Sequence, residues 1–138
     1  MENSTVHISV SELGLPFVSD CDILTTSEDF YHMDRTADFH VLIYVTDGTM
    51  YVTENGQDYE IAAGEILFLK SGFRHFGRYE TLRGTRWFYA HFYLPEATPN
   101  CETALLLPKK YTLLREAHWK KTYIKCAIIS TVWTRQKA

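Results

Sequence analysis

The chain has 138 residues, a formal net charge of −3 and an apolar fraction of 46%. This length predicts one domain, and this composition is that of a globular chain rather than a disordered one. No apolar run approaches the roughly 18 residues that a membrane-spanning helix needs, and the first ten residues lack the pattern of a secretion signal. We therefore expect a globular domain that does not contact a membrane.

The cysteines bear on the compartment. Cys21, Cys101 and Cys126 are odd in number and form no C-x-x-C pair. This usage predicts reduced thiols in a cytoplasmic protein, with neither a disulfide framework nor a zinc site.

Residues 1–30 are mixed in character. Val6–Val10 predicts a short strand, and Gly14-Leu15-Pro16 would interrupt any element that follows it. We interpret 1–30 as an N-terminal arm with one early strand.

A barrel core is predicted over residues 31–95. Runs rich in β-branched and aromatic residues predict strands at Val41–Val45, Met50–Thr53, Tyr59–Ile61, Ile66–Leu69, Arg74–Tyr79 and Trp87–Leu94. Glycines recur every eight residues between the earlier runs, at Gly48, Gly56, Gly64 and Gly72. Asp47-Gly48 and Asn55-Gly56 are dipeptides typical of two-residue hairpins. The period predicts antiparallel strands that fold back at regular intervals, and hence a barrel or sandwich.

The end of the chain is different. Pro95, Pro99 and Pro108 mark a connector over 96–108, and residues 109–138 contain neither Gly nor Pro. An amphipathic helix is predicted there, with an apolar stripe formed by Leu114, Ala117, Ile124, Ile128 and Val132. The stripe would pack on the barrel of the same chain or on a second copy, as a dimerisation surface.

The charge is unevenly divided. Residues 1–108 carry 6 basic and 16 acidic side chains, whereas residues 109–138 carry 8 basic and 1 acidic. Either the basic helix docks on an acidic body with its charges solvated, or it approaches an anionic partner such as DNA.

Histidines raise the question of a metal. His40, His75 and His91 lie in or beside predicted strands, but the sequence contains no H-x-H pair, and no Glu follows His40 at a spacing that shares its strand face. A metal site in a barrel needs three or four converging ligands. We expect no metal and no cofactor, and we interpret these histidines as hydrogen-bonding groups of a pocket or core.

The last predicted strand carries the best candidate pocket. Alternation places Trp87, Tyr89, His91 and Tyr93 on one face. Aromatic area with a few polar tips is typical of a small-molecule site, although a solvent-facing row is the alternative. His40, Leu42 and Tyr44 would line the same cavity if their strand turns these residues inward.

The stretch from Asp34 to Pro95 resembles the cupin-type effector-binding domain of AraC-family transcription regulators. The similarity rests on Asp34-Arg35, Phe39–Gly48 (FHVLIYVTDG), Gly64–Gly77 (GEILFLKSGFRHFG) and Arg86–Pro95 (RWFYAHFYLP). Lys70 replaces a proline that is usual in the second cupin motif, and only His40 represents the first motif, which suits the metal-free regulators of the family.

The resemblance implies a mainly β fold, a cupin-like double-stranded β-helix or jelly-roll barrel, followed by a C-terminal α-helical segment. It also implies that Arg35, Tyr89 and His91 contact an effector, with Phe76 at a further pocket position. A surface ion pair of Arg35 with Asp34 or Asp38 is the alternative for that arginine. In the family, the helix after the barrel commonly mediates dimerisation.

The resulting hypothesis is a domain, not an enzyme, that senses a small sugar-like effector and forms a homodimer. DNA would be contacted only through a helix-turn-helix region, which we expect to lie outside this chain. The alternatives are a small metal-dependent cupin enzyme, an isomerase or dioxygenase using His40, His75 and His91, and a purely structural dimerisation module.

Overall fold

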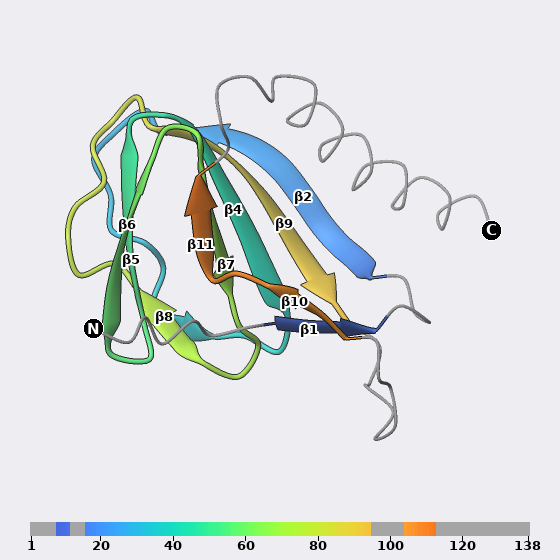
Figure 1. The fold of residues 1–138 in the computed structure, drawn as a ribbon. Helices are drawn as coiled ribbons and strands as arrows, with labels where there is room; N and C mark the ends of the chain where they lie inside the picture. Colours follow the sequence, from blue (N-terminus) through green and yellow to red (C-terminus); the bar gives the residue numbers. More distant parts are fainter. Residues whose placement is uncertain (1–7, 12–15, 95–103, 113–138) are drawn as a thin grey trace.

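The computed structural model describes residues 8–11, 16–94 and 104–112, which form β-strands and no helix (Figure 1). The mainly β prediction is therefore confirmed for this part of the chain. The helix predicted at the C-terminus lies outside the described residues from position 113 onward, together with its apolar stripe. Within the described ranges, no helix is present that could cross a membrane.

Two antiparallel sheets face each other. The larger sheet contains β2 (Phe17–Thr25), β4 (His40–Asp47), β7 (Glu65–Leu69), β9 (Arg86–Tyr93) and β11 (Lys110–Thr112), in the order β11-β7-β4-β9-β2. The smaller sheet contains β3 (Arg35–Thr36), β5 (Thr49–Glu54), β6 (Gln57–Ala62) and β8 (Arg74–Phe76), in the order β3-β8-β5-β6. A separate pair is formed by β1 (Ile8–Ser11) and β10 (Ala104–Leu107).

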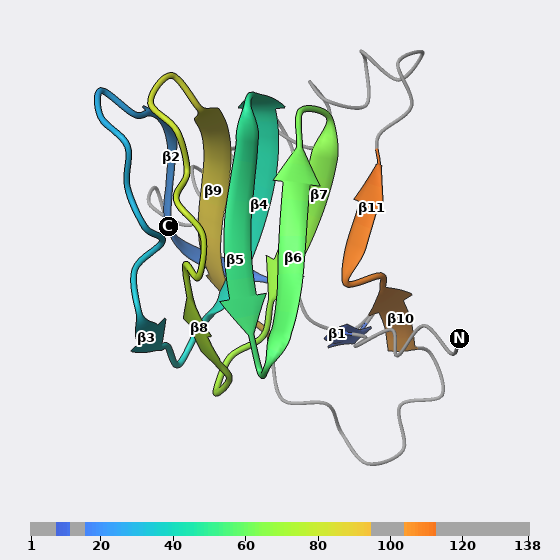
Figure 2. The ribbon, with the colours of Figure 1, turned by 90° about the vertical axis from the view of Figure 1, so that its left-hand side faces the viewer.

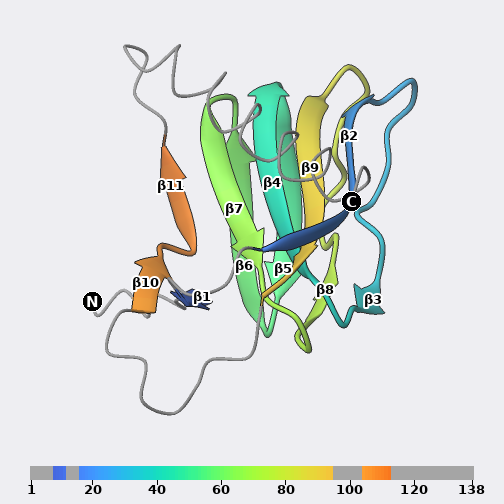
Figure 3. The same cartoon turned by 90° about the vertical axis from the view of Figure 1, so that its right-hand side faces the viewer.

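The two layers are seen from opposite sides in Figures 2 and 3. Figure 2 looks onto β5 and β6 with β9, β4 and β7 behind them, and Figure 3 looks onto the larger sheet. A cluster of buried side chains from both sheets fills the space between the layers: Val41, Ile43, Val45, Met50, Val52, Ile61, Leu67, Leu69 and Trp87. This interior cluster is the core that positions the candidate site.

The larger sheet is apolar on both faces. A second cluster, drawn from its strands alone, contains Val18, Leu42, Ile66, Phe68, Phe88, Ala90 and Phe92. Successive side chains of a strand point to opposite faces, so burial of both faces requires an unbroken apolar run such as Ile66–Leu69. The composition of these strands thus reflects burial on two sides.

The eight-residue glycine period predicted strands joined by hairpins, but only one of its four turns is a hairpin. The strands predicted from it are present, but β5 and β6 are the only strands of the described chain that are adjacent in sequence and also paired, apart from isolated bridges. Their turn, at Asn55-Gly56, has φ of 50° and 78°, as a type I′ hairpin requires. One of the two predicted hairpin dipeptides is therefore confirmed.

The Asp47-Gly48 prediction of a hairpin was wrong. β4 and β5 lie in different sheets, so Gly48 marks a corner where the chain crosses from one layer to the other. Gly48 has φ of 78°, and a Cβ added there would lie 2.7 Å from Oγ1 of Thr85. Gly64 and Gly72 also separate strands of different sheets, so the chain alternates between layers at three of the four glycines. A local turn signal does not distinguish a hairpin from such a crossing.

Two strands of the larger sheet were missed. The nine-residue strand β2 lies in the segment that we interpreted as an arm, and it pairs with β9 along most of its length. β11 occupies the start of the segment predicted as helix from residue 109, so a helix does not begin there. The sequences of both strands show little of the local pattern that predicts a strand. Both are stabilised by pairing with strands far away in the sequence.

Candidate functional site

Arg35 connects the two sheets. Its Nε donates a hydrogen bond to Nε2 of His75 at 3.1 Å, and its Nη2 lies 3.3 Å from Nε2 of His91. His75 belongs to β8 in the smaller sheet, and His91 belongs to β9 in the larger one. We call Arg35, His75 and His91 the arginine cluster.

Strand pairing explains how these residues meet. Arg35 lies opposite His75 in the short β3–β8 ladder, so both side chains point to the same face. On the larger sheet, His91 lies opposite Val41, which belongs to the interior cluster. Both sheets therefore direct the cluster into the space between them.

Phe39 forms an aromatic wall beside the cluster. The Arg35 guanidinium carbon lies 5.2 Å from the centroid of the Phe39 ring, and the Phe39 ring is stacked on His91 with centroids 4.3 Å apart. A guanidinium over an aromatic face is favoured electrostatically and is held in a defined orientation. The arginine is thus positioned by two imidazoles and one ring.

The histidines of the cluster are neutral acceptors. Burial, followed by the charge of Arg35, lowers the pKa of His75 to about 4 and also lowers the pKa of His91. Each uses Nε2 toward the guanidinium, which places its ring proton on Nδ1. The cluster therefore carries one positive charge, that of Arg35.

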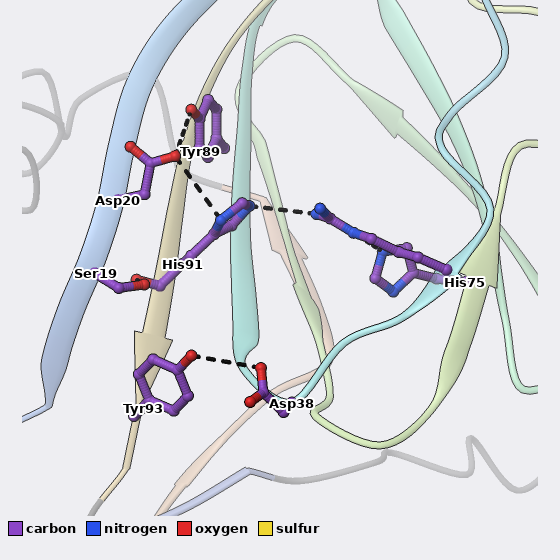
Figure 4. Close-up of polar contacts among 8 residues, drawn as sticks. Ser19, Asp20, Asp38, His75, Tyr89, His91 and Tyr93 are labelled. Carbon is purple, nitrogen blue, oxygen red and sulfur yellow. Dashed lines mark hydrogen bonds and ion pairs between the residues drawn. The ribbon is translucent and has the colours of Figure 1, made fainter.

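A carboxylate supports the outer side of the cluster (Figure 4). Asp20 Oδ2 accepts a hydrogen bond from the Tyr89 hydroxyl at 3.0 Å and lies 4.0 Å from Nδ1 of His91. The two ring nitrogens of His91 thus face groups of opposite charge: Nε2 faces Arg35, and Nδ1 faces Asp20. This arrangement fixes the orientation of the His91 ring.

His32 extends the cluster on the side of His75. The two rings are 5.4 Å apart, and burial lowers the pKa of His32 to about 3, with the neighbouring His75 as the next cause. Nε2 of His32 and Nδ1 of His75 are buried ring nitrogens without a hydrogen-bond partner among the described residues. A buried polar atom of this kind costs about 1–3 kcal/mol when it stays unpaired, so this part of the interior favours a bound polar group.

Arg35 does not form the ion pair that was the alternative for it. Asp34 forms its ion pair with Arg74 at 2.7 Å, and Asp38 accepts a hydrogen bond from the Tyr93 hydroxyl at 3.4 Å. Within the described part of the chain, no carboxylate lies within 4.0 Å of the Arg35 guanidinium. Its charge has no counter-ion there.

Other predicted site residues lie elsewhere. Trp87 is on the same face as Tyr89 and His91 but is a core residue, 8% exposed and stacked on Phe30 at 5.4 Å. Phe76 carries the side chains of Arg74 and Arg78 over its ring, at 4.9 and 6.0 Å. The structure does not bring it to the arginine cluster, since its neighbour His75 takes the inward position.

His40 and Tyr44 point away from the arginine cluster, to the outer face of β4. Tyr44 packs against the outer cluster, and the His40 ring lies 5.4 Å from the ring of Phe92. His40 Nδ1 accepts a hydrogen bond from the backbone N–H of Ser71 at 3.0 Å. The register of β4 with β9 decides this, because it pairs Ile43 rather than Tyr44 with Tyr89. The sequence left this choice of face open.

Asp20, His32 and Phe39 belong to the site but were not among its predicted residues. The pairing of Asp20 with His91 joins positions 71 residues apart in the chain, and no local pattern reports it. Phe39 alone had a signal, because it precedes a predicted strand by two positions. Within the described residues, no group of three or more His, Cys, Asp or Glu side chains is arranged to hold a metal ion.

The sequence has recognisable relatives. Residues 21–121 match the model of a family described as AraC-like ligand binding domain. Over 61 residues the chain is 34% identical to an uncharacterised HTH-type transcriptional regulator, YisR of Bacillus subtilis strain 168. That match covers 44% of this chain and 21% of YisR, so the chain corresponds to a small part of the regulator's length.

Solved structures show the same fold. YhaK of Escherichia coli is similar with a TM-score of 0.51 and 18% identity, over 78% of this chain and 51% of YhaK. ToxT of Vibrio cholerae is similar with a TM-score of 0.50 and 12% identity, over 94% of this chain and 50% of ToxT. Together with the family match, they confirm the resemblance and the cupin-like β fold predicted from the sequence.

Proposed function

This chain belongs to the family of AraC-like ligand binding domains, and we propose that it is the effector-sensing domain of a bacterial transcription regulator. The observation that carries the proposal is the arginine cluster, a charged guanidinium held between two sheets by neutral imidazoles. A charge that a fold takes out of water is normally paired with an opposite charge, and Arg35 has no carboxylate partner in the described part of the chain. An arginine in this position is suited to binding a ligand.

The effector we propose is a small polar molecule such as a sugar. Arg35 would donate hydrogen bonds to it, and His91 and Tyr89 would contact its polar groups. Phe39 and the interior cluster would supply apolar contact. The structure of ToxT was solved with an unsaturated fatty acid bound. That ligand belongs to ToxT, and the sugar proposed here rests on the polar character of the arginine cluster.

The remaining parts of the proposal concern assembly. We propose a cytoplasmic homodimer formed through the apolar stripe of residues 109–138, with DNA bound by a helix-turn-helix region of the regulator. YisR, described as HTH-type, supports this arrangement. Effector binding would shift the equilibrium between two dimer arrangements and thereby report on ligand concentration. The domain would bind its effector without changing it chemically.

A ligand screen tests the sensing function. Sugars and polyols would be added to the purified chain and the melting temperature followed. A true effector at 100 times its Kd should stabilise the fold by about 2.7 kcal/mol. Arg35→Ala and Tyr89→Ala should each weaken that ligand at least tenfold, by calorimetric titration.

Matched surface variants control for the substitutions themselves. Arg83→Ala and Tyr79→Ala remove the same residue types at exposed positions outside the cluster and should leave affinity unchanged. Parent-like affinity in both Arg35→Ala and Tyr89→Ala would show that the ligand binds elsewhere. A stabilising ligand that is converted to product during titration would favour an enzyme instead.

A further inference from the structure

The cation of the arginine cluster is uncompensated. Arg35 is partly buried, and its two hydrogen-bond partners are both imidazoles. The nearest acid on the outer side, Asp20, is engaged by Tyr89 and is separated from Arg35 by the His91 ring. A partly buried positive charge that faces no acid attracts an anion.

The Arg35 guanidinium also has N–H groups that form no hydrogen bond within the described residues. An arginine carries five N–H groups, and the contacts with His75 and His91 account for two of them. Nη1 has no hydrogen-bond partner among the described residues, and Nη2 retains a second hydrogen. Nη1 and Nη2 together form the planar fork that matches the two oxygens of a carboxylate.

We propose that the effector carries a carboxylate, bound by Nη1 and the remaining hydrogen of Nη2, the edge of the Arg35 guanidinium that His75 and His91 leave free. The inference rests on the proposed sensing function and narrows the class of effector, to a sugar acid or another small organic acid. A neutral sugar would leave the interior charge unbalanced. A phosphate carries more charge than one guanidinium offsets, and the described cluster contains no second cation beside Arg35.

The imidazoles have a defined part in this recognition. Each imidazole accepts one hydrogen bond from Arg35 through Nε2. The remaining guanidinium hydrogens are left for a carboxylate of the ligand, since neither imidazole carries a negative charge that would bind them. They hold the guanidinium plane while leaving its charge intact, and Phe39 supports it from the side. A carboxylate partner in their place would neutralise the arginine and abolish the preference for anions.

Matched pairs of probes test the charge requirement. Galacturonate would be compared with galactose, and phenylacetate with 2-phenylethanol, by calorimetric titration of the purified chain at pH 7.5. We expect at least one acid to bind ten times or more tightly than its neutral partner. Tenfold corresponds to about 1.4 kcal/mol. Inorganic phosphate, as a third probe, should bind more weakly than that acid.

Variants assign the preference to Arg35. Arg35→Gln should reduce affinity for the acid at least ten times more than it reduces affinity for the neutral partner, which removes the preference for the acid. Arg35→Lys, which keeps the charge but loses the fork, should retain part of the preference. Arg83→Gln removes the same charge at an exposed loop position and should leave the acid's affinity unchanged.

The outcomes separate this inference from the function beneath it. Neutral members that bind as tightly as their acids, phosphate that binds most tightly, or an acid preference that survives in Arg35→Gln would each overturn the carboxylate assignment. If a neutral sugar binds and Arg35→Ala abolishes its binding, the sensing function stands and the carboxylate does not. The preference of the unaltered chain does not depend on whether any variant folds.

Discussion

Two cations enter the interior of this domain and meet opposite surroundings. Lys109, at the end of the loop that leads into β11, is 4% exposed and forms an ion pair with Glu54, which is 2% exposed. Arg35 enters the same interior and meets His75 and His91. Where the charge is balanced within the protein, the contact can only hold the fold together. Where it is left unbalanced, it is available to a ligand.

The Lys109–Glu54 pair ties distant segments. Glu54 precedes the β5–β6 turn, and its second oxygen accepts the backbone N–H of Lys70 at 2.7 Å. The Lys109 carbonyl accepts from the backbone N–H of Phe68 at 2.9 Å. One buried carboxylate therefore fixes the start of β11 and the corner after β7. Burial lowers the pKa of Lys109, and its bond to Glu54 opposes that shift.

The largest expected effect comes from breaking the balanced pair. Glu54→Gln leaves a buried ammonium without a counter-charge, and removing one partner of such a pair costs about 3–5 kcal/mol. Urea unfolding should show this loss. Adding Lys109→Met to Glu54→Gln should restore part of it, because the unpaired charge is then gone. A single variant within 1 kcal/mol of the parent would mean that the pair is not a structural tie.

The second largest effect is a loss of stability in acid, which we expect from His75 of the arginine cluster and its neighbour His32. The folded pKa values of His32 and His75, about 3 and about 4, lie below the ordinary 6.5, so the unfolded chain takes up protons first. The contribution of these two histidines to stability is then constant above about pH 7 and falls from about pH 6.5 toward the folded values. The limiting slope is about 1.4 kcal/mol per pH unit for each histidine.

His75→Gln separates this contribution. The amide can still accept from Arg35 but does not titrate, so the slope of stability between about pH 6.5 and pH 4.5 should decrease by up to one histidine's share. His32, His40 and His91, whose pKa values are also lowered, account for a remaining slope of the same sign. A parent-like slope in His75→Gln would contradict the neutral imidazole in the cluster.

The smallest effect on stability is expected at Arg35 itself. Arg35→Gln loses contacts with two imidazoles but also removes a partly buried charge without a counter-ion, and these effects oppose each other. We expect the free energy of unfolding to change by less than about 1 kcal/mol. Urea unfolding of this variant beside Glu54→Gln is the direct comparison. A loss as large as that of Glu54→Gln would make Arg35 a structural residue.

The local patterns of the sequence predicted the strands of the core well. Val41–Val45, Ile66–Leu69 and Trp87–Leu94 all lie in or overlap strands, because their β-branched and aromatic residues favour a pleated, buried backbone. The Asn55-Gly56 turn was also predictable, since only a few residues tolerate positive φ. For the site, the face that carries Tyr89 and His91 followed from alternation alone.

Pairing between distant strands was not predictable in this way. The sequence indicated that Gly48 ends a strand but could not indicate that the chain changes sheets there. Likewise, the inward face of β4 depends on its register with β9, and a shift of one residue would exchange Val41 and Ile43 for Leu42 and Tyr44. Both faces of β4 are apolar, so composition gave no preference.

By itself the sequence determined the strand-rich composition and the positions of the turns. It also indicated Arg35 and the aromatic strand at Trp87–Leu94 as candidates for the site. Only the tertiary structure decided that His75 and His91 hold Arg35, that Asp34 is taken by Arg74, and that Glu54 balances Lys109. The physical reason is that charge balance depends on distance in space. Residues 40 or 56 positions apart along the chain meet here within hydrogen-bonding range, and no local pattern encodes that meeting.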